Sequence, residues 1–71
     1  MIDINKLTEK DRGRWVEYYP SVGNAQIGKI KSWNSNWIFV VYNCANDWKN
    51  YANYTAAATS PENLYFERIN V

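Results

Sequence analysis

The stretch that decides the fold runs from Ile27 to Tyr42 and reads IGKIKSWNSNWIFVVY. β-Branched and aromatic residues fill both of its halves, and such residues suit a pleated, half-buried surface. A polar Asn-Ser-Asn break at 34–36 separates the halves, and asparagine tolerates turn geometry. The stretch therefore predicts a β-hairpin with strands over 26–33 and 37–42. In a chain of 71 residues, this hairpin has to be the centre of the fold.

Shorter segments with a strand pattern flank the hairpin, and they are residues 14–19, 54–59 and 64–69. In the first of them, Val16 and Tyr18 share one face, because side chains alternate along a strand. Gly28 lies inside the second strand of the chain, where a glycine predicts a bulge or a sharp bend. The sequence therefore predicts an all-β protein with five short strands.

The remaining segments predict a single small domain with an extension. Residues 1–12 mix isolated apolar residues with charges, so we expect a partly mobile N-terminal arm and a domain over 13–71. The sequence Ser-Pro-Glu-Asn at 60–63 predicts one 3₁₀ turn before the last strand. A chain of this size buries only a modest core, and its four Trp, six Tyr and two Phe residues supply the necessary bulk.

Residue counts argue against several kinds of site. With one cysteine and no histidine, the chain cannot form an internal disulfide or a zinc site of four Cys or His ligands. It also lacks the commonest general base, and nothing beside Cys44 would activate the thiol, so we expect a non-enzymatic protein without a cofactor. A free thiol is typical of a reducing compartment, which predicts a cytoplasmic protein. No apolar stretch approaches the roughly 20 residues of a membrane helix.

The order of these elements resembles that of SH3-like small barrels, with a glycine in the second strand and a 3₁₀ turn before the fifth. The resemblance covers roughly residues 13–68 and implies a five-stranded barrel. Three stretches also resemble small uncharacterised proteins of phages and prophages: GKIKSWN at 28–34, FVVY at 39–42, and the run from Tyr54-Thr55 through TSPENL at 59–64. This second resemblance implies a phage-related origin and brings neither an established activity nor site residues.

Aromatic residues beyond the needs of the core predict a protein-binding surface. Trp48, Tyr51 and Tyr54 recur at every third position of an asparagine-rich connection, which would align them on one side of a 3₁₀ turn. If Trp48 and Tyr51 stand on the surface, they are the kind of residue that binding hot spots use. If they pack inward, they belong to the core.

The resemblance to peptide-binding SH3 domains implies further candidates. By position, the possible counterparts of the aromatic groove residues of those domains are Tyr19, Trp37, Pro61 and Tyr65. The chain departs from those domains because it lacks their acidic loop run and tandem tryptophans. Recognition of proline-rich ligands therefore does not follow from the resemblance.

A basic strand face makes nucleic acid the alternative partner. Lys29 and Lys31 share one face of the second strand, Trp33 follows two residues on, and Arg14 lies nearby if the first strand pairs with the second. Such cations can track phosphates while a ring stacks on a base, although lysines also simply keep a strand face soluble. The net charge of +1 predicts no general attraction to nucleic acid or membranes. A protein partner is therefore expected first, and self-association is a third possibility.

Overall fold

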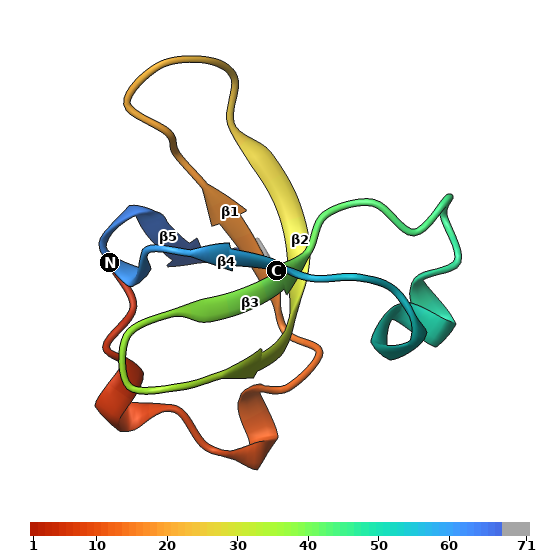
Figure 1. Ribbon diagram of the computed structural model, residues 1–71, viewed down its shortest axis with the longest axis horizontal. Helices are drawn as coiled ribbons and strands as arrows, with labels where there is room; N and C mark the ends of the chain where they lie inside the picture. The colour runs from red at the N-terminus through yellow and green to blue at the C-terminus, as the bar shows by residue number, and fades with distance from the viewer. Residues whose placement is uncertain (68–71) are drawn as a thin grey trace.

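The computed structural model describes residues 1–67 of the chain. Its five strands are β1 (Trp15–Tyr18), β2 (Gln26–Trp33), β3 (Ile38–Val41), β4 (Ala57–Thr59) and β5 (Leu64–Phe66). They form one antiparallel sheet in the order β4-β3-β2-β1-β5 (Figure 1). The predicted all-β class is confirmed, and β2 has the predicted bounds. The other strands are shorter than expected, and residues 68 and 69 of the expected last strand lie outside the described residues.

The hydrophobic core lies on one face of the curved sheet. The buried residues that form it are Ile2, Val16, Ile30, Ile38, Val40 and Leu64. The register explains this set, because Ile30 pairs directly with Val40 and paired residues project from the same face of a sheet. Tyr18 packs against the core beside the buried Val16, so the shared face predicted for these two residues is confirmed.

The N-terminal segment packs against the sheet. It contains two 3₁₀ turns, η1 (Ile4–Lys6) and η2 (Glu9–Asp11). Ile2 is only 2% exposed, and its N–H donates to the Pro61 carbonyl at 3.0 Å. The segment is therefore packed against the sheet, and its partial mobility stays a prediction. The physical reason for the packing is that a small core needs the apolar cover of this segment. The domain boundary after residue 12 stays a prediction.

The bend of β2 has a different origin from the one predicted. The register with β3 shifts between Ile30 and Ser32, so the irregularity lies at Lys31 and not at Gly28. Gly28 is instead a point of close approach, since a Cβ atom there would lie 2.5 Å from the carbonyl oxygen of Val41. Because Gly28 has no side chain, the backbones of β2 and β3 can approach each other closely at this position.

The long connection between β3 and β4 carries η3 (Trp48–Asn53), and it extends from one side of the sheet (Figure 1). Val41 and Cys44 are fully buried but lie outside the main core cluster. Val41 pairs with Lys29, whose ammonium lies near the Tyr51 ring, so η3 covers this second face of the sheet. The predicted 3₁₀ turn before the last strand is present as η4 (Pro61–Asn63).

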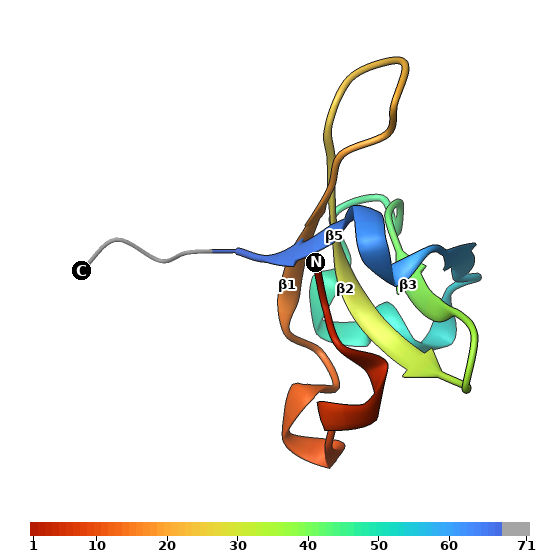
Figure 2. The ribbon, with the colours of Figure 1, turned by 90° about the vertical axis from the view of Figure 1, so that its left-hand side faces the viewer.

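Among the described residues, two strands form the edges of the sheet. β4 and β5 end the strand order and do not pair with each other, so the expected barrel is not closed. Strands this short can bend strongly without completing a hydrogen-bonded ring. The connection between β1 and β2 extends beyond the sheet as a long loop (Figures 1 and 2). The β5 edge and this loop lie at the surface considered next.

Candidate functional site

The aromatic residues predicted for protein binding fall in three separate places. Tyr19 and Tyr65 lie together beside β1 and β5, with ring centroids 5.6 Å apart. Trp37 lies directly before β3, where it lines a pocket beside β4. Trp48 and Tyr51 belong to η3. Each place is therefore considered by its own exposure, shape and charge.

The first place is a row of side chains across three strands. Glu17 of β1 pairs with Tyr65 of β5 on one side and with Ile27 of β2 on the other. Directly paired residues of an antiparallel sheet project from the same face, so these three side chains lie side by side. Tyr19 follows Glu17 by two residues, and its N–H continues the ladder by donating to the Asn63 carbonyl at 3.0 Å. Glu17, Tyr19, Ile27 and Tyr65 are named the tyrosine patch.

The tyrosine patch is exposed and hollowed. Tyr19, Ile27 and Tyr65 expose 47%, 49% and 46% of their surfaces, which is high for side chains of this size. A pocket of about 470 Å³ is lined by Glu17, Tyr19, Tyr65 and Phe66. Phe66 follows Tyr65 in β5, is half-buried and packs against the core. The patch therefore offers a partner an exposed and hollowed aromatic surface.

A carboxylate sets the electrostatics of the tyrosine patch. The Tyr19 hydroxyl donates to the Glu17 carboxylate, and this hydrogen bond raises the pKa of Tyr19 because it favours the neutral phenol. Among residues 1–67 the ion pairs join Arg12 to Glu9 and Arg14 to Asp11, so neither involves Glu17. Within that range the carboxylate therefore stands beside two exposed rings without a cation.

Arg14 lies over the ring of Phe66, one of the residues that line this pocket. Its Cζ atom is 3.7 Å from the centroid of the Phe66 ring, and its Nη1 atom is 3.0 Å from Asp11 Oδ1. The pKa of Asp11 is lowered, first by the hydrogen bond from the Thr8 backbone and then by Arg14. Because Asp11 balances its charge, Arg14 adds little positive field to the pocket.

The second place is the pocket beside β4, which has a volume of about 390 Å³. Trp37, 44% exposed, lines it together with Tyr18 and Tyr42. The Tyr42 hydroxyl and Thr59 Oγ1 are 2.9 Å apart, and burial raises the pKa of Tyr42. Its hydroxyl is thus already bonded within the chain, which leaves Trp37 as the main exposed ring of this place.

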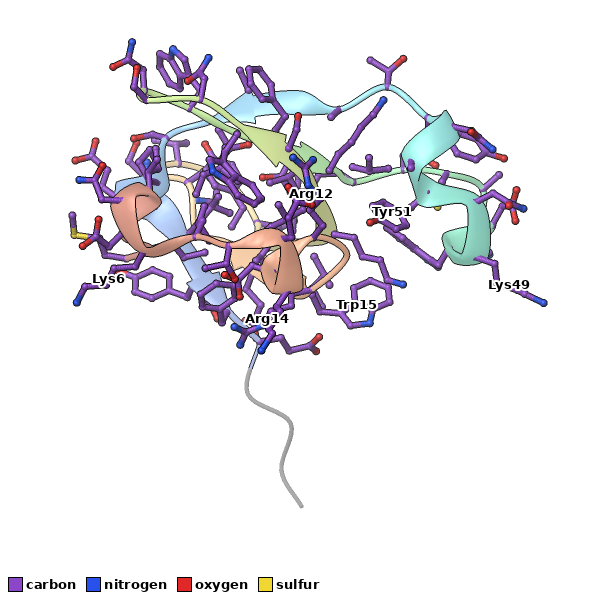
Figure 3. All side chains as sticks on the ribbon, turned by 90° about the horizontal axis from the view of Figure 1, so that it is seen from below. Lys6, Arg12, Arg14, Trp15, Lys49 and Tyr51 are labelled. Atoms are coloured by element: carbon purple, nitrogen blue, oxygen red, sulfur yellow. The ribbon has the colours of Figure 1, made fainter. Side chains whose placement is uncertain are left out.

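The third place packs on the sheet. The Trp48 ring lies against Trp15 with centroids 4.7 Å apart, and both side chains are half-buried. Lys29 Nζ is 4.9 Å from the centroid of the Trp15 ring and 5.4 Å from that of Tyr51. Figure 3 shows Tyr51 pointing from η3 toward the sheet, on the side where Trp15 lies. Trp48 and Tyr51 therefore attach η3 to the sheet.

Trp15 is a residue that the sequence reasoning did not single out. The alternation of side chains along β1 does indicate its direction: Trp15 is adjacent to the buried Val16 and therefore faces the opposite side of the strand. Only the packing of η3 onto that side shows what the ring does there.

The residues of the nucleic-acid alternative are engaged within the chain. Lys29 lies between two rings, as described above, and Lys31 Nζ donates to the Tyr54 carbonyl at 2.9 Å. Trp33 packs against the core, and the Arg12 guanidinium lies 4.9 Å from the centroid of its ring. These contacts hold η3 and the N-terminal segment against the sheet. Figure 3 shows the labelled cations spread over separate elements, with Lys49 pointing away.

Groups suited to catalysis or metal binding do not converge in the described part of the chain. The Cys44 thiol is free and buried. Between residues 1 and 67, no group of three or more Cys, Asp or Glu side chains is placed to hold a metal ion. The helical segments in the same range are short 3₁₀ turns, none with the length and apolar character that crossing a bilayer requires.

Similarity to known proteins does not identify which of these three places is a binding surface. The candidate is therefore selected by its exposure, shape and charge. Comparison of the chain with protein-family models, with curated proteins and with solved structures found no match.

Proposed function

We propose that this protein is a small, non-enzymatic binding module that binds a protein partner through the tyrosine patch. The observation that carries the proposal is the exposed pair Tyr19 and Tyr65 around the pocket beside β5. Tyrosine is enriched at protein interfaces because its ring is rigid and apolar while its hydroxyl can bond to a partner. A ring held on a strand also loses little conformational freedom on binding.

The SH3-like designation belongs to the same proposal. It is supported by the strand order and by the 3₁₀ turn η4 between β4 and β5. A phage-related origin is supported only by the sequence resemblance, and a cytoplasmic location by the free thiol of Cys44. The mode of binding proposed here does not depend on either.

The other two places support binding less well. Trp48 and Tyr51 already contact the sheet, so a partner that used them fully would have to break the attachment of η3. A nucleic acid on Lys29 and Lys31 would likewise have to replace their contacts with the two rings and with the Tyr54 carbonyl. Nucleic-acid binding stays a prediction that no contact in the structure favours.

A library of random displayed peptides tests the proposal. Wild-type protein should enrich peptides that bind at least about tenfold more weakly to the double variant Tyr19→Ala/Tyr65→Ala, because hot-spot aromatics dominate binding energy. Trp37→Ala is the matched control, since it removes an aromatic side chain of similar exposure from a different place. Circular dichroism must show that all three proteins are folded. Failure to enrich any peptide, or equal binding by the double variant, would refute the proposed function.

A further inference from the structure

We infer that the tyrosine patch binds an arginine side chain of its partner, with the guanidinium stacked on a tyrosine ring and paired with the Glu17 carboxylate. This inference rests on the proposed function and names the residue that the patch recognises. Its basis is the combination of rings and a carboxylate in one pocket, and the way in which the chain binds its own arginines.

The arginines of residues 1–67, Arg12 and Arg14, are bound in the same way. Each stacks on an aromatic ring and pairs with a carboxylate at the same time. The rings are those of Trp33 and Phe66, with centroids 4.9 and 3.7 Å from the guanidinium carbon, and the carboxylates are those of Glu9 and Asp11, at 2.7 and 3.0 Å. A planar guanidinium can make both contacts, because its N–H groups point outward in the plane that stacks on the ring.

The tyrosine patch holds the same two components. Glu17, Tyr19 and Tyr65 line one pocket of about 470 Å³. The planes of the two rings are 72° apart, so the exposed rings form a corner. The half-buried Glu17 carboxylate accepts from the Tyr19 hydroxyl through Oε2, and a carboxylate can accept further hydrogen bonds. The patch therefore has what binds the chain's own arginines, and the ion pairs among residues 1–67 leave Glu17 without one.

A second carboxylate adds to the negative charge of this face. Glu67 follows Tyr65 by two residues, and its N–H continues the ladder by donating to the Trp15 carbonyl at 3.1 Å. Its side chain therefore lies on the same face as Tyr65, and among residues 1–67 it too has no ion pair. The ammonium of Lys29, on the same face, lies over the Trp15 ring. Glu17 and Glu67 together favour a cationic side chain beside Tyr65 over an acidic one.

The arrangement favours arginine over lysine. A guanidinium is weakly hydrated and can stack on a tyrosine ring while it donates in its own plane to Glu17. The lysine ammonium is a compact and strongly hydrated charge, so it has to give up more water to contact the rings. A neutral side chain would leave the Glu17 carboxylate unpaired in the covered pocket.

Peptides from the random library test the inference. Those that bind wild-type protein but not Tyr19→Ala/Tyr65→Ala should share an arginine. In a synthetic copy, replacing this arginine by citrulline, which keeps its shape without the charge, or by lysine should weaken binding at least about threefold. Patch-dependent peptides without a shared arginine, or equal affinity after either replacement, would overturn the inference and leave the proposed function standing. If no peptide depends on the patch, the proposed function fails and the inference fails with it.

Glu17→Gln tests the ion pair, because glutamine keeps an acceptor for the Tyr19 hydroxyl. The variant should bind the arginine peptide about two- to fivefold more weakly, and citrulline should cost it less affinity than it costs wild type. Glu9→Gln is the matched control, since it removes the same charge from η2, and it should bind as wild type does. An equal effect of citrulline on Glu17→Gln and on wild type, or equal weakening by the two variants, would show the inference to be wrong. The citrulline comparison on wild-type protein holds even if Glu17→Gln does not fold.

Discussion

Replacing Trp48 by alanine decides whether η3 is held by packing. Removal of a fully buried tryptophan costs about 3–5 kcal/mol. Trp48 is half-buried against Trp15, so about half of that, roughly 2 kcal/mol, should be lost. The aromatic pair itself accounts for about 0.5–1.5 kcal/mol of this loss. In a domain with a total stability near the low end of about 5–15 kcal/mol, such a change is large.

The free energy of unfolding is measured by urea denaturation with far-ultraviolet circular dichroism, because fluorescence changes whenever a tryptophan is removed. Trp37→Ala is the comparison, since Trp37 is 44% exposed and none of the ring pairs among residues 1–67 includes it; its loss should be smaller than that of Trp48→Ala. A loss below about 0.5 kcal/mol for Trp48→Ala would refute the reasoning. Trp48 would then be a free surface ring and a better binding candidate than it is here.

Gly28→Ala should lower the melting temperature, because the new Cβ would lie 2.5 Å from the Val41 carbonyl oxygen, a backbone atom that cannot swing away. Overpacking of this kind costs about 1–3 kcal/mol, and an unchanged melting temperature would contradict the close approach. The pKa of Asp11 is lowered from its ordinary 3.8 in the folded protein, so its stabilisation is fully present above that pH and is lost as the pH falls through the lower folded value. Asp11→Asn should therefore lose less stability than wild type on acidification from about pH 5 to pH 2, and acid-unfolding curves of equal slope would show this to be wrong.

Local sequence predicted the hairpin and the turn before the last strand well. The bounds of β2 and the position of η4 follow from β-rich runs, an Asn-Ser-Asn break and a Ser-Pro start, which act over a few neighbouring residues. Gly28 was identified as special for the wrong reason. A bulge depends on the register with β3, and register is not visible in one strand alone.

The candidate site was predicted residue by residue but not as an arrangement. Tyr19 and Tyr65 were both candidates, yet their contact depends on the pairing of Glu17 with Tyr65 between strands far apart in the chain. A second pairing, of Glu17 with Ile27, places Ile27 on the other side of Glu17. Lys29 and Lys31 looked like free cations in the sequence, and only the return of η3 to the sheet gave each of them a partner.

The sequence by itself determined the all-β class, the central hairpin and the supply of aromatic residues, because strand propensity, alternation and turn chemistry act between neighbours. Only the tertiary structure decided which of these rings are buried and which are exposed. Trp48 lies in an asparagine-rich connection and Tyr65 lies between Leu64 and Phe66, but neither local pattern shows whether another element covers the ring. Trp48 packs because η3 folds back onto Trp15, whereas Tyr65 stays exposed because β5 is the edge of the sheet formed by residues 1–67.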